Sequence, residues 1–117
     1  MTIKRIGIGK SMSACVVYGG VARTAGFVAE AAAGKSVKEQ TADILAQIDA
    51  MLKEAGTDKT KILKANIWLT SMAGFAQMNE AWDAWVPQGH TPARATVESP
   101  KLAAPGLDVE IMVEAAV

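Results

Sequence analysis

The chain has 117 residues, which is enough for one domain with a sizeable hydrophobic core. Its 12 lysines and arginines balance 12 aspartates and glutamates, so the formal net charge is zero. This balance excludes the basic surface typical of proteins that bind nucleic acid or an acidic membrane. No apolar run reaches the roughly 18 residues of a membrane span, and the N-terminus lacks the apolar stretch of a secretory signal. We therefore expect a single domain over residues 1–117 in the cytoplasm.

Cys15 is the only cysteine, so an internal disulfide is excluded and a metal site would need other ligands. A catalytic thiol usually has a histidine beside it, and the only histidine, His90, is far away in the sequence. We expect Cys15 to be a buried structural residue.

The first predicted element is a β-hairpin. Two β-rich runs, 13–18 and 21–28, flank Gly19 and Gly20, which can adopt the positive φ angles of a two-residue turn. The stretch 29–35 that follows is small and polar-edged, which predicts a loop.

A helix is predicted from Ser36 to Gly56. Ser36 and Glu39 form the S-x-x-E pattern of a capping box, and Gly56 fits the position just beyond the last turn. Apolar or small residues recur at helical spacing on one face. They are Val37, Thr41, Ile44, Leu45, Ile48, Met51, Leu52 and Ala55.

A strand over 61–70 and a second helix come next. The strand alternates Leu63, Ala65, Ile67 and Leu69 on one face with Lys64, Asn66, Trp68 and Thr70 on the other. Ser71 is predicted to cap the helix, which ends before Pro87. Its apolar stripe consists of Phe75, Met78, Trp82 and Trp85.

Two more strands, within 91–99 and over 108–114, complete the chain. The order hairpin, helix, strand, helix, strand, strand predicts an α+β fold in which two helices cover one face of a mixed sheet. The helices need the face that carries the aliphatic residues of strands 61–70 and 108–114. The opposite face is then expected to carry Asn66, Trp68, Arg94, Thr96, Glu98, Glu110 and Met112.

Trp68 and Met112 are unusual on a solvent-exposed sheet, and their presence there favours a subunit interface. Arg94 and Glu110 are expected to approach one another across this face. Two interpretations remain open from spacing alone. Arg94 could present its guanidinium to a ligand carboxylate, or it could pair with Glu98 or Glu110 and only orient the interface.

The end of the chain carries a recognisable motif. TPARATVES at 91–99, followed by a proline-containing loop and VEI at 109–111, resembles the PAR[ST]-x-V…VEI ending of the RidA (YjgF/YER057c/UK114) family. GGVARTAGFV at 19–28 is similar to the family's strand with the sequence SGQI, and 40–85 is similar to its central helix–strand–helix core. The resemblance covers residues 13–116.

The resemblance implies a chorismate-mutase-like fold and a homotrimer whose subunit clefts hydrolyse 2-imino or enamine acids to 2-keto acids and ammonia. In these clefts Arg94 would hold the substrate carboxylate, and Glu110 would position or activate water. The backbone near Thr96 would bind the carbonyl or imino group, and Gly26 would form part of the wall. Asn79 would have a structural role, tying its helix to a neighbouring loop. No metal or cofactor is implied.

The chain departs from the family's pattern at three positions. Met12 takes the place of a tyrosine that closes the cleft over the substrate, Ala25 replaces a serine, and Thr96 replaces a frequent cysteine. An alternative is therefore a protein that binds 2-keto acids without turnover. The older family label of endoribonuclease is disfavoured by the zero net charge and the lack of a basic, aromatic stripe.

Overall fold

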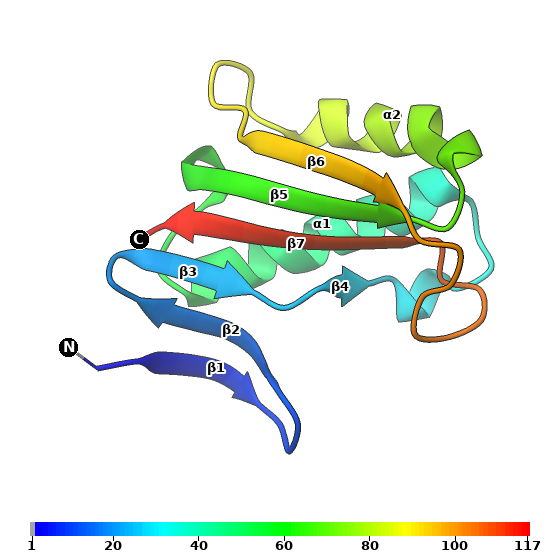
Figure 1. Cartoon of the computed structure of the whole chain (residues 1–117). Coiled ribbons are helices and arrows are strands. Elements are labelled where there is room, and N and C mark those ends of the chain that lie inside the picture. Colours follow the sequence, from blue (N-terminus) through cyan, green and yellow to red (C-terminus); the bar gives the residue numbers. More distant parts are fainter. Residues whose placement is uncertain (1) are drawn as a thin grey trace.

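The computed structural model describes residues 2–117, whose strands form one mixed sheet with both helices on one face (Figure 1). The strand order is β1-β2-β3-β7-β5-β6, and β4 also pairs with β7. The elements are β1 (Lys4–Ile8), β2 (Ser13–Tyr18), β3 (Val21–Thr24), β4 (Phe27–Val28), α1 (Val37–Glu54), β5 (Ile62–Leu69), α2 (Phe75–Trp85), β6 (Ala93–Glu98) and β7 (Val109–Ala116). The predicted two-layer α+β architecture is confirmed. Neither helix is both long and apolar enough to cross a membrane.

The signals at the ends of α1 act as predicted. The Ser36 hydroxyl accepts a hydrogen bond from the Glu39 amide, and Gly56, beyond the C-cap, has a φ of +87°. The prediction for Ser71 is wrong in detail. Its hydroxyl caps a short 3-10 turn, Met72–Gly74, and α2 begins only at Phe75.

The core lies between the helices and the sheet. The alternating residues of β5 and β7 point into it as predicted, and α1 and α2 cover them. These residues are Ala65, Ile67, Leu69, Val109, Ile111 and Val113. The prediction for Leu63 is wrong, because the register of β5 against β7 shifts between Ile62 and Lys64. Ile62 takes the buried position, and Leu63 is left 51% exposed.

The N-terminal part has two strands more than predicted. Gly19 and Gly20 form the hairpin turn with φ angles of +61° and +79°, but the second arm is divided into β3 and β4. The unpredicted strand β1 pairs with β2 and forms the edge of the sheet. Its Ile6 packs with Cys15 in a small second cluster. Cys15 is fully buried, and desolvation raises the pKa of its thiol, as expected for a structural cysteine.

Candidate functional site

The strand β6 places Arg94 on the helix side of the sheet. β6 runs parallel to β5 with Arg94 beside Ala65 and Thr96 beside Ile67, and both partners face the core. Paired residues on adjacent strands point to the same face. The prediction that Arg94, Thr96 and Glu98 lie on the face opposite the helices is therefore wrong. Ala95 and Val97 occupy that open face instead, next to Asn66 and Trp68.

Side chains of α2 hold the Arg94 guanidinium. Its Nη1 donates to Asn79 Oδ1 at 2.8 Å, and its Cζ lies 5.4 Å from the centre of the Trp82 ring and 5.8 Å from that of Phe75. Asn79 was expected to tie its helix to a loop, and that expectation is wrong because its amide bonds to Arg94 on β6. A cation fixed in this way can bind a carboxylate with little further loss of side-chain freedom.

An open pocket of about 570 Å³ adjoins Arg94. Asn79 and Trp82 of α2 line it together with Gln88 and Thr91 from the loop before β6. The charged residues that line this pocket are Arg94 and Asp83, so the guanidinium of Arg94 is the group there that can bind a small anion.

Thr96 follows Arg94 by two residues on the same strand, so both side chains point to the same side. Its hydroxyl is shielded from solvent and has no hydrogen-bond partner within residues 2–117. A buried hydroxyl without a partner is costly. Thr96 is therefore a candidate to contact a ligand or a bound water.

Glu110 and Gly26 lie together on the open face of the sheet. Glu110 on β7 pairs with Trp68 on β5 and with Val28 on β4, so it projects away from the helices. Gly26 sits directly against its carboxylate, and a side chain at this position would collide with it. This contact between Gly26 and Glu110 was not predicted from the sequence, where the two residues were assigned separate roles in the cleft.

The structure does not bring Arg94 and Glu110 together within one chain. They lie on two strands separated by β5 and point to opposite faces. Neither of the ion pairs considered for Arg94 forms among the residues described: the Glu98 carboxylate instead accepts a hydrogen bond from the Met72 amide. Met12 is also remote from Arg94. It is 60% exposed in the β1–β2 connection, at the sheet edge opposite β6 (Figure 1).

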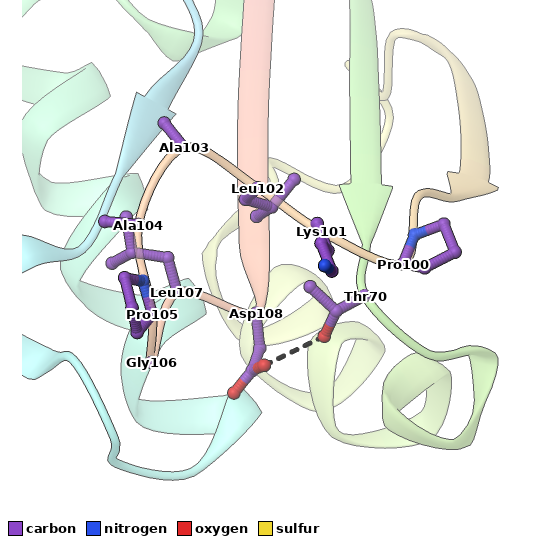
Figure 2. Close-up of a pocket in the computed structure, with 10 residues that line it drawn as sticks. All are labelled: Thr70, Pro100, Lys101, Leu102, Ala103, Ala104, Pro105, Gly106, Leu107 and Asp108. Atoms are coloured by element: carbon purple, nitrogen blue, oxygen red, sulfur yellow. Dashed lines mark hydrogen bonds between the residues drawn. The ribbon is translucent and has the colours of Figure 1, made fainter.

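A second pocket, of about 580 Å³, lies under the loop between β6 and β7 (Figure 2). Its one carboxylate belongs to Asp108, which accepts hydrogen bonds from Thr70 at 2.8 Å and from Gln40 at 3.3 Å. Gln40 is fully buried and also accepts from the Asp108 amide. These contacts anchor the start of β7, two residues before Glu110, and leave the carboxylate engaged by the protein itself.

Sequence reasoning missed the contact between Trp82 and Arg94. Trp82 was interpreted only as part of the apolar stripe of the helix, and it is indeed buried there. The signal that could have revealed it is spacing: Phe75, Asn79 and Trp82 recur at intervals of four and three, on one face of α2.

Comparisons with known proteins agree with the fold and the motifs. The family model described as endoribonuclease L-PSP matches residues 2–117. The chain is 42% identical over 113 residues to a RutC family protein of Haemophilus influenzae, covering 97% of each. A crystal structure of a YjgF family member from Neisseria meningitidis superposes with a TM-score of 0.94 at 46% identity, covering 99% of this chain and 95% of that one.

One relative has a name that states an activity. The chain is 33% identical over 98 residues to the chloroplastic Reactive Intermediate Deaminase A of Arabidopsis thaliana. The match covers 84% of this chain and 48% of that protein.

Proposed function

Because the chain belongs to the endoribonuclease L-PSP family, which includes the RutC and YjgF proteins, we propose that it hydrolyses 2-imino or enamine acids to 2-keto acids and ammonia. The observation that carries the proposal is the Arg94 guanidinium, held by Asn79 and two aromatic rings at the wall of a pocket. The named deaminase among the relatives supports the same chemistry.

The reaction requires the protein only to orient the substrate and to transfer protons. An imine carbon is electrophilic, so water can attack it once the substrate carboxylate is fixed on Arg94. Glu110 takes a proton from the attacking water and returns one to the nitrogen, which leaves as ammonia when the carbonyl forms. One water is consumed for each imine, and no nucleophilic side chain is required.

The positions of the two groups imply that the site is assembled from two subunits. Arg94 and Glu110 point to opposite faces of one sheet, so a single chain cannot place both on one small substrate. The open face offers a contact surface, because Val97 is 50% exposed there and Trp68 and Met112 are only partly buried. We include in the proposal a homotrimer in which Arg94 of one subunit faces Glu110 and Gly26 of its neighbour.

Binding of 2-keto acids without turnover is the second candidate function. It is favoured by Met12, which cannot supply a hydroxyl group at the position that the resemblance assigns to the cleft lid. A nuclease is a weaker candidate, since the chain has zero net charge and its one histidine, His90, is exposed on a loop outside both pockets described above.

The decay of 2-iminopropanoate distinguishes the two candidates. An enzyme shortens the lifetime of the imine in proportion to its concentration, whereas a binding protein leaves it at the spontaneous rate. Calorimetry with pyruvate on the same preparation measures carboxylate binding independently. Imine decay at the spontaneous rate together with pyruvate binding would replace the deaminase proposal by the second candidate.

A further inference from the structure

Four side chains on one face of α2 converge on the guanidinium of Arg94. Phe75, Met78, Asn79 and Trp82 lie at positions i, i+3, i+4 and i+7, which places them along a single helical stripe. Met78 and Trp82 are buried, at 0% and 4% exposure. A cation packed on such a surface loses water, and the loss is offset only if its contacts are specific.

The hydrogen bonds of Arg94 all involve one end of the guanidinium. Nη1 donates to Asn79 Oδ1 at 2.8 Å and to the Met78 sulfur at 3.9 Å, and these are its side-chain hydrogen bonds to residues 2–117. A guanidinium carries five N–H donors in a rigid plane. The donors of Nη2 and Nε therefore remain for a ligand, and together they form one edge that matches a carboxylate.

The Asn79 hydrogen bond holds the guanidinium at one point only, so rotation about the Cζ–Nε bond, which exchanges Nη1 and Nη2, is opposed by little else on the polar side. The rings of Trp82 and Phe75 supply the missing constraint, with centres 5.4 and 5.8 Å from Cζ. A cation over an aromatic face is held by the ring quadrupole. Trp82 also lines the pocket beside Arg94.

We infer that Trp82 is a positioning residue: with Phe75 it fixes the guanidinium plane of Arg94 so that the Nε–Nη2 edge faces the substrate carboxylate. The inference rests on the proposed function for the identity of the ligand. The fixed orientation itself is a property of the chain without ligand, so it can be measured separately.

Trp85 provides a matched control on the same helix. Its ring packs against Trp82 at 5.4 Å between centroids, its indole donates to Asp49, and the Lys59 amine lies over its face. Within residues 2–117, the cation–π contacts of Arg94 are with the rings of Phe75 and Trp82, and Trp85 makes none. Trp85→Leu therefore removes an indole of the same size from the same helix and leaves the two rings that contact Arg94.

The first experiment uses NMR to test whether the guanidinium of Arg94 has a fixed orientation in the protein without ligand. Restricted rotation gives separate signals for the Nη1 and Nη2 protons, and Arg94→Lys identifies them by their disappearance. We expect separate signals in the parent, in Trp82→Phe and in Trp85→Leu, and averaged signals in Trp82→Leu. Averaged signals in the parent, or separate signals in Trp82→Leu, would overturn the inference.

The second experiment measures pyruvate binding by calorimetry and, where imine hydrolysis occurs, KM and kcat. Trp82→Leu should weaken binding and raise KM about tenfold, which lies between the values for an exposed and a desolvated cation–π contact. kcat should change less than about twofold, because the lost contact stabilises the bound substrate and the transition state equally. Trp82→Phe should restore binding. Equal losses in Trp82→Leu and Trp85→Leu would show a general packing effect and contradict the inference.

The two experiments separate failure of the inference from failure of the proposed function. A parent protein that binds pyruvate without hydrolysing imine fails as a deaminase, yet the variants still test the role of Trp82. If Trp82→Leu does not fold, Phe75→Leu removes the second ring from a less buried position and should give the same changes with a smaller magnitude. Separate NMR signals and unchanged binding in that variant would likewise contradict the inference.

Discussion

A Cβ atom on Gly26 would lie 2.1 Å from Glu110 Oε2, far inside van der Waals contact. The backbone of Gly26 has an ordinary φ, so a larger residue is opposed by this close contact and not by the backbone conformation, and it would require the Glu110 carboxylate to move. Gly26 therefore sets the position of the carboxylate that we propose as the proton carrier.

Gly26→Ala should displace the Glu110 carboxylate and lower kcat for imine hydrolysis about tenfold or more, since a displaced base loses much of its effect. Pyruvate binding should persist, because Arg94 is untouched. Gly74→Ala is the control: its Cβ would lie 2.9 Å from a Val37 methyl group, so it creates a close contact that does not involve Glu110. Equal loss of kcat in both variants would point to crowding in general and not to Glu110.

Arg94→Ala should weaken pyruvate binding at least about tenfold, because a hydrogen bond to a charged group contributes on the order of 1.5–3 kcal/mol. Turnover should fall with it. Calorimetry with pyruvate and the imine-decay assay measure the two effects. Arg94→Lys keeps the charge but loses the planar fork, so it should recover only part of the binding. Parent-like affinity in the alanine variant would remove Arg94 from the site.

Glu110→Gln should leave pyruvate binding nearly unchanged and lower imine hydrolysis roughly 100-fold, the low end for a general acid–base group. Glutamine preserves the shape and hydrogen bonding of the side chain but cannot accept the proton. Sedimentation must show the same assembly as the parent, since Glu110 also lies on the proposed contact face. Hydrolysis at the parent rate would show that Glu110 is not the proton carrier.

The strength of local signals explains which parts of the fold could be predicted. Helix α1 has a capping serine, a terminal glycine and a continuous apolar face, and each of these specifies the same boundaries. Strand β1 has only Ile6 buried between charged residues and a glycine, so its sequence has no strand pattern. It forms because β2 offers it a pairing edge, which is tertiary information.

The face of β6 illustrates the same limit within the site. Alternation shows that Arg94 and Thr96 share a face, but a strand of small and polar residues does not reveal which face is buried. The register against β5 decides it, and that register depends on how α2 crosses over the sheet. The residue types of the site were thus predictable from the motif, while their distribution over two faces was not.

Met12→Tyr should raise kcat for imine hydrolysis if the missing hydroxyl group limits closure of the cleft. Met12 is exposed in the β1–β2 connection, so a larger polar ring there causes no internal clash. Steady-state kinetics on 2-iminopropanoate measure the change. Unchanged or slower turnover would show that residue 12 does not act as a lid in this chain.

Mixed assemblies test the central claim most directly, namely that Arg94 and Glu110 act together across a subunit boundary. Arg94→Ala and Glu110→Gln chains, differently tagged, are co-expressed and the mixed trimers are purified. If each cleft takes Arg94 from one subunit and Glu110 from the next, each mixed trimer restores about one cleft in three. Imine hydrolysis by the purified mixed trimers should then rise to about a third of the parent rate, well above either variant alone. Mixed trimers no more active than the better of the two pure variants, or a protein that sediments as a monomer, would contradict the claim.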